Sequence, residues 1–116
     1  MERKITVQKL NKSLPDAIQM AEKYYSVLSA VNGLGLTHRE IQLIAFAAVK
    51  GNISYANIRK EFCETYSSSS ATINNIISKL KKMGVFVKDG TKVKVNPAIV
   101  LNFENNLVLQ ITLKHG

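Results

Sequence analysis

Residues 70–95 read SATINNIISKLKKMGVFVKDGTKVKV, and this stretch decides the fold. Its first half repeats apolar residues at helical spacing, in one narrow stripe made of Ile73, Ile76, Ile77, Leu80 and Met83. Gly84 ends the predicted helix. Alternating runs then lie on either side of Asp89-Gly90, and Asp-Gly in this setting is the strongest short signal for a β-hairpin. The stretch therefore predicts a helix that runs directly into a hairpin.

The face of this helix opposite the apolar stripe is short, polar and basic. Rotation by about 100° per residue places on it Ala71, Asn75, Ser78 and Lys82, flanked by Thr72, Asn74, Lys79 and Lys81. No acidic residue belongs to this face. Such a face suits contact with a negatively charged partner.

The positive charge of the chain is concentrated in two places. The 116 residues contain 16 Lys and Arg against 8 Asp and Glu, a net charge of +8. Residues 65–94 supply six lysines against one aspartate, a net +5, and residues 1–12 supply +3. The rest of the chain is neutral overall. This localised excess is typical of a protein that binds a polyanion, although a solvated lysine-rich surface without a partner explains the same count.

A long helix is predicted near the N-terminus. It begins after an N-cap at Ser13, with Pro15 in its first turn, and it ends at Asn32-Gly33. Its expected inward stripe consists of Leu14, Ala17, Ile18, Ala21, Tyr24, Tyr25, Leu28 and Val31.

Two shorter helices are predicted next. The first begins with a capping box, Thr-His-Arg-Glu at 37–40, and it ends at Gly51. The second covers roughly residues 55–66 and takes its cap from Ser54 or Asn52. Its expected inward side chains are Ile58, Phe62 and Cys63.

Both ends of the chain carry alternating polar and apolar residues. Residues 4–8 form a short strand or an ordered arm in this interpretation. Residues 99–103 and 107–113 predict a second pair of strands near the C-terminus. No linker divides the chain, so we expect one domain.

The three helices and the hairpin over residues 37–97 resemble the winged helix-turn-helix core of MarR-type and related bacterial, plasmid and phage regulators. The resemblance rests on residues 37–43, 53–58 and 70–90. Its most specific part is LKKMG at 80–84, which ends a helix and leads straight into the Asp-Gly hairpin. In its last twenty residues the chain departs from many dimeric members, because a strand pattern stands where they have a long helix.

The resemblance implies an α+β fold, a winged helix-turn-helix with an N-terminal extra helix and a C-terminal β-hairpin. The single domain 1–116 then consists of a basic arm at 1–12, the extra helix at 13–33, the winged-helix core at 37–97 and the C-terminal hairpin at 98–116.

The resemblance also implies a recognition helix over residues 69–83 in the major groove and a wing on the DNA backbone or minor groove. Small and amide side chains let such a helix approach base edges, and lysines meet phosphates. For the serine run 67–70, a flexible loop with a helix cap is the alternative. The candidate DNA-binding residues are Ser69, Ser70, Ala71, Thr72, Asn74, Asn75, Ser78, Lys79, Lys81, Lys82, Lys88, Lys92 and Lys94.

We therefore expect sequence-specific binding of double-stranded DNA by a regulator of transcription or replication. The expected form is a homo-oligomer joined through the N-terminal helix or the C-terminal strand. The alternative is a winged-helix scaffold for protein interaction or assembly, for example a phage structural or accessory protein in a virion. The apolar run 107–113 and the basic arm motivate this alternative, since both suit contact with a neighbouring chain.

Other classes of function find little support in the residues. We expect no enzyme and no cofactor, because the chain has no Gly-rich phosphate loop, no paired catalytic carboxylates and no nucleophile with a base at recognisable spacing. His38 and His115 have no partners at metal-ligand spacing. The single cysteine, Cys63, is predicted to be a small core residue and favours a reducing, cytoplasmic compartment. The longest charge-free apolar stretch, 41–49, is too short for a membrane span.

Overall fold

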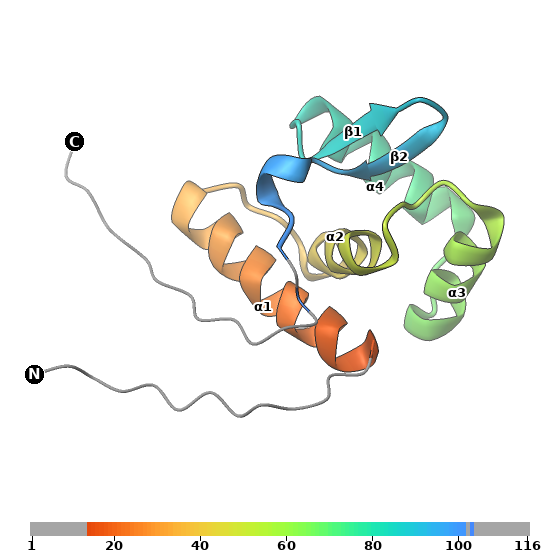
Figure 1. Cartoon of the computed structure of the whole chain (residues 1–116), viewed down its shortest axis with the longest axis horizontal. Coiled ribbons are helices and arrows are strands. Elements are labelled where there is room, and N and C mark those ends of the chain that lie inside the picture. The colour runs from red at the N-terminus through yellow and green to blue at the C-terminus, as the bar shows by residue number, and fades with distance from the viewer. Residues whose placement is uncertain (1–13, 102, 104–116) are drawn as a thin grey trace, which may run out of the picture.

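The computed structural model describes residues 14–101 and 103. Over this part the fold is α+β, with four helices and one antiparallel hairpin, and this order is compatible with a winged helix. Figure 1 shows α2 in the middle, α1 on one side of it, and α3, α4 and the hairpin on the other. The elements are α1 (Leu14–Asn32), α2 (His38–Lys50), α3 (Ala56–Tyr66), α4 (Ser70–Lys82), β1 (Phe86–Asp89), β2 (Lys92–Val95) and the 3-10 turn η1 (Pro97–Ile99).

Helix α1 has the predicted bounds, and Gly33 follows it with a φ of 63°. The predicted inward residues are mostly confirmed, since Ala17, Ala21 and Tyr25 are buried. Val31 is an exception, because 51% of it is exposed. It lies about 120° around the helix from Tyr25, and Ser29, only about 40° away, takes the inward place instead. Ser13, the expected cap, lies outside the described residues.

Helix α2 is the centre of the core. Its capping box is confirmed: Thr37 Oγ1 accepts the Glu40 N–H at 3.1 Å, and Glu40 Oε1 accepts the Thr37 N–H at 2.9 Å. Gly51 ends it in the left-handed region, as predicted. The helix is covered on most sides, and its buried residues are Glu40, Ile41, Leu43, Ile44, Ala45, Phe46 and Ala47.

Neither of the predicted capping residues caps α3. The helix begins at Ala56, and its N-cap residue is Tyr55, whose side chain makes no capping hydrogen bond. Asn52 Oδ1 instead accepts the N–H groups of Ser54 and Tyr55, and the Ser54 hydroxyl accepts the Val93 N–H of β2. Asn52 therefore bonds within the connector and Ser54 bonds to the hairpin, so neither side chain caps the helix. Within α3, Phe62 is buried, and Ile58 and Cys63 are half-buried against the core.

Helix α4 confirms the helix predicted over residues 69–83, with Ser69 as its N-cap and Met83 as its C-cap. The Ser69 hydroxyl accepts the Thr72 N–H at 3.2 Å. Its buried side chains are Ile73, Ile76, Ile77 and Leu80. Met83 was expected in the same stripe but is 38% exposed. The reason is that Met83 is the C-cap, after which the chain turns away through Gly84 at a φ of 78°.

The hairpin forms as predicted, but its loop is shifted by one residue. Asp89 pairs with Lys92, so the two loop residues are Gly90 and Thr91 rather than Asp89 and Gly90. Gly90 has a φ of 63°, and a positive φ at the first loop position is the type II′ pattern that suits the strand twist. Phe86 and Val95 pair at the other end and are buried in the core.

The predicted strand at 99–103 is wrong. Residues Pro97–Ile99 form a 3-10 turn instead, because Asn96 Oδ1 accepts the Ala98 N–H at 3.0 Å and closes the chain on itself. The segment then returns to α1, as Figure 1 shows, and buries Phe103 there. The second half of the predicted C-terminal hairpin, 107–113, and the arm at 1–12 lie outside the described residues.

No helix in the described part of the chain is both long and apolar enough to cross a bilayer.

Candidate nucleic-acid interface

Helix α4 presents a continuous polar face to solvent. Ala71, Asn75, Ser78 and Lys82 are all exposed and lie within about 60° of one another around the helix. We call these four residues the outer strip. The structure brings them together as the sequence predicted, and the opposite side of the helix is buried in the core. The outer strip is therefore fixed in direction by the packing of α4.

Lys79, on one flank of the outer strip, is held by α2. Its Nζ lies 2.8 Å from Glu40 Oε2, and Glu40 is only 6% exposed. Burial by itself raises the pKa of Glu40, but the hydrogen bonds and charge of Lys79 and the hydrogen bonds of Thr37 together hold this pKa below its usual range. The carboxylate is therefore charged at neutral pH and neutralises Lys79.

Asn74, on the other flank, is held by α3. Arg59 Nη1 donates to Asn74 Oδ1 at 2.8 Å, and Arg59 Nε donates to the carbonyl oxygen of Ile53 at 2.9 Å. The guanidinium thus joins the connector before α3 to the middle of α4. Arg59 did not stand out in the sequence, because it lies 15 residues from its partner and belongs to no motif.

The wing lysines do not form one row. Lys94 Nζ lies 2.8 Å from Asp89 Oδ2, and the pKa of Asp89 is lowered by this hydrogen bond and by the charge of Lys94. Lys88 is paired with Val93, and Lys92 with Asp89, so Lys88 and Lys92 leave the hairpin on opposite faces. Of the six lysines predicted to bind DNA, Lys79 and Lys94 form ion pairs. Among the described residues the other four form none, and these are Lys81, Lys82, Lys88 and Lys92.

Tyr55 is a surface residue that the sequence analysis missed. It is 48% exposed at the start of α3, and Lys92 Nζ of the wing lies 5.7 Å from its ring centroid. A lysine over an aromatic ring at this distance is a cation–π contact. Because the two residues are 37 positions apart, no local sequence pattern indicates the contact. Tyr55 places an aromatic ring and a phenol between the start of α3 and the wing.

The serines before α4 act as turn and cap. Ser67 ends α3 with a φ of 53°, and Ser69 caps α4. The Ser69 hydroxyl also donates to Thr72 Oγ1 at 3.0 Å, so these two predicted contact residues bond to each other. Ser70 is exposed. The alternative interpretation of this run as a connection with a helix cap therefore accounts for Ser67 and Ser69.

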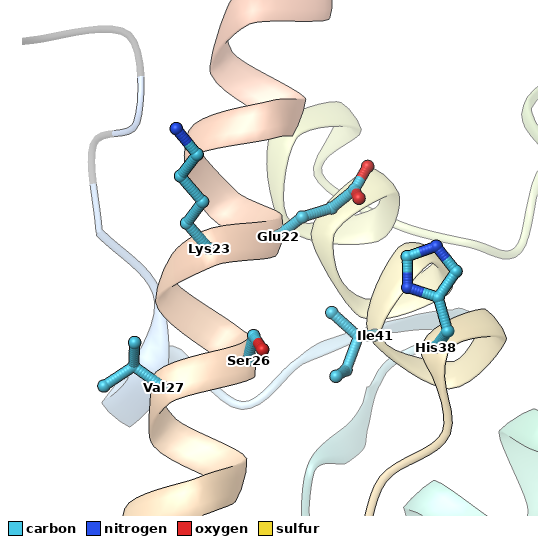
Figure 2. Close-up of a pocket in the computed structure, with 6 residues that line it drawn as sticks. All are labelled: Glu22, Lys23, Ser26, Val27, His38 and Ile41. Atoms are coloured by element: carbon cyan, nitrogen blue, oxygen red, sulfur yellow. The ribbon is translucent and has the colours of Figure 1, made fainter.

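A separate cleft of about 500 Å³ lies between α1 and the start of α2. Figure 2 shows its residues coming from two helices, Glu22, Lys23, Ser26 and Val27 from α1 and His38 and Ile41 from α2. His38 Nε2 lies 3.2 Å from the side-chain amide of Gln42, and Glu22 hydrogen-bonds to Tyr66, whose pKa is raised by burial and by Glu22. In this cleft, one ring nitrogen of His38 and the carboxylate of Glu22 are thus engaged by neighbouring side chains.

Within residues 14–101 and 103, no group of three or more His, Cys, Asp and Glu side chains is arranged to hold a metal ion. No family model matches the chain, and no curated protein or solved structure is significantly similar to it.

Proposed function

We propose that this chain is a winged-helix protein that binds double-stranded DNA through α4 and the hairpin and regulates transcription or replication. The observation that carries the proposal is the outer strip, an exposed face of α4 without an acidic residue, next to a basic hairpin. The 13 residues of α4 make a rod of about 20 Å, and a major groove about 12 Å wide admits one helix.

The connection between α2 and α3 supports the winged-helix assignment. The Ile53 N–H donates to the Val93 carbonyl at 2.9 Å, and the Ser54 hydroxyl accepts the Val93 N–H. The connector thus lies along the open edge of β2 and joins the hairpin to the helices that precede it, in the helix-helix-helix-hairpin order of a winged helix. This contact fixes the hairpin beside the start of α3.

The proposed roles follow from chemistry and exposure. Asn75 is suited to adenine, and the methyl group of Ala71 is suited to the methyl group of thymine. The phosphate contacts are assigned to the lysines that form no ion pair within residues 14–101 and 103, namely Lys81, Lys82, Lys88 and Lys92. Four such contacts predict that the logarithm of the binding constant falls with the logarithm of salt concentration at a slope of about −3.6.

The test is fluorescence anisotropy with a short labelled duplex of mixed sequence, titrated at several salt concentrations. We expect Lys82→Ala to weaken binding and to make the slope shallower by about 0.9. Lys23→Ala is the matched control, because it removes the same charge from an exposed site on α1. Absence of any salt-dependent binding by the unmodified chain at low salt would refute the proposal.

A scaffold role in an assembly is the second candidate, because Val100 and Leu101 are 38% and 39% exposed next to each other. Adjacent exposed apolar residues suit contact with another chain. Light scattering across a range of protein concentrations tests this role. A mass of one chain throughout, with DNA binding intact, rules out self-assembly through these residues.

A further inference from the structure

We infer that Lys79 and Asn74 are positioning residues that hold α4 against α2 and α3, and that neither contacts DNA. This inference rests on the proposed function and reassigns two of its candidate residues. It changes the expected interface from a broad polar face to the outer strip with Lys81 and the wing.

The two residues lie on opposite flanks of the outer strip. Five positions along a helix correspond to a rotation of about 140°, so Asn74 points toward α3 and Lys79 toward α2. The outer strip lies in the arc between them. Each flank therefore has one polar contact to a different neighbouring helix.

Each partner is itself anchored to backbone. Glu40 uses one carboxylate oxygen for the Thr37 N–H and the other for Lys79. Arg59 uses Nε for the Ile53 carbonyl and Nη1 for Asn74. A group with two fixed hydrogen bonds restricts the position of the side chain that it holds. The two contacts thus fix how far α4 rotates about its own axis.

The charge of Glu40 decides whether Lys79 contributes to DNA binding. A buried carboxylate 2.8 Å from Nζ cancels the field that a phosphate would feel, and only half of the Lys79 side chain is exposed. Removal of Lys79 alone leaves an uncompensated negative charge beside the DNA-binding face. Removal of both charges leaves the local net charge unchanged.

This difference gives a test with four variants in the same salt titration on mixed-sequence duplex. Glu40→Gln keeps a capping side chain at this position and releases Lys79, so we expect tighter binding and a slope steeper by up to about 0.9. Lys79→Ala weakens binding. The double variant Glu40→Gln/Lys79→Ala restores the slope of the unmodified chain, whereas Lys82→Ala makes it shallower by about 0.9. A double variant with the same shallow slope as Lys82→Ala overturns the inference.

A positioning role also predicts rescue by a similar side chain. Lys79→Arg keeps a charged donor for Glu40, so we expect its affinity and slope to match those of the unmodified chain. For the other flank, Asn74→Ala is compared with its neighbour Asn75→Ala. We expect Asn74→Ala to lower the melting temperature by a few degrees, because it removes the acceptor of Arg59 Nη1. Asn75→Ala leaves the melting temperature unchanged, because the Asn75 side chain makes no hydrogen bond within the described part of the chain.

Urea unfolding separates this inference from the proposed function. Two double-mutant cycles, Glu40→Gln with Lys79→Ala and Arg59→Met with Asn74→Ala, measure the coupling within each pair without DNA. If the unmodified chain binds no DNA, the proposed function is refuted, whereas the two cycles still measure the coupling free energy within each pair. Additive effects in both cycles overturn the positioning role. Coupling in both, with an unchanged slope in the double variant, supports it.

Discussion

The phenol of Tyr25 in α1 donates a hydrogen bond of 2.7 Å to the carbonyl oxygen of Ile99, 74 residues further along the chain. The ring of Phe103 lies 5.7 Å from the rings of both Tyr24 and Tyr25, measured between centroids. These contacts join the first helix to the segment that follows the hairpin. The α1 helix is therefore part of the same core as the hairpin.

This contact predicts the effect of Tyr25→Phe. The substitution keeps the aromatic packing and leaves the Ile99 carbonyl without its donor, so we expect the free energy of unfolding to fall by about 1 kcal/mol. Urea unfolding at neutral pH measures the change. Tyr55→Phe is the control, because Tyr55 is 48% exposed and its hydroxyl has no protein acceptor among the described residues. Equal stability of Tyr25→Phe and the unmodified chain contradicts the prediction.

The buried carboxylate of Glu40 predicts a loss of stability in acid. Its pKa is lower in the folded chain than the ordinary value of 4.5, so the contribution is fully present above pH 4.5. As the pH falls below 4.5, the unfolded chain takes up this proton before the folded chain does, and stability declines. We expect the melting temperature of the unmodified chain to fall more steeply between pH 5 and pH 3 than that of Glu40→Gln. Parallel curves for the two proteins contradict the prediction.

Local signals explain why most of the fold could be predicted. The capping box at Thr37 and Glu40, the left-handed Gly51 and the Gly90 turn each act over a few residues, and each fixes the end of an element. The segment 99–103 misled the prediction because its short apolar run, IVLNF, fits a strand as well as it fits an irregular segment packed on a helix. The cap from Asn96 and the burial of Phe103 on α1 decided the outcome.

The candidate site was only partly predictable for a different reason. Helical rotation was enough to identify the outer strip, because the buried face of α4 has a strong period. The partners of Lys79 and Asn74 are 39 and 15 residues away, and they depend on how the helices pack. Sequence counting treats all six lysines of residues 65–94 as equal, whereas the structure neutralises two of them with carboxylates.

Gly90 predicts a link between the hairpin turn and DNA binding. Its φ of 63° lies in the left-handed region, which costs an alanine roughly 1 kcal/mol, although open space surrounds the position. We expect Gly90→Ala to lower stability by about this amount and to weaken DNA binding through the displaced wing lysines. Unfolding and anisotropy measure the two effects. Thr91→Ala is the control at the neighbouring loop residue, where φ is not positive.

Tyr55 predicts how the ring beside Lys92 contributes to DNA binding. The cation–π contact holds the wing lysine next to the start of α3, and an exposed contact of this kind accounts for roughly 0.5–1 kcal/mol. We expect Tyr55→Ala to weaken binding to mixed-sequence duplex by roughly two- to five-fold. Tyr55→Phe separates the ring from the hydroxyl: it keeps the cation–π contact and loses any hydrogen bond from the phenol to a phosphate. In the Lys92→Ala background, Tyr55→Ala should have a smaller effect, because the ring then has no lysine to hold. An undiminished effect in that background shows that the ring acts on DNA without Lys92.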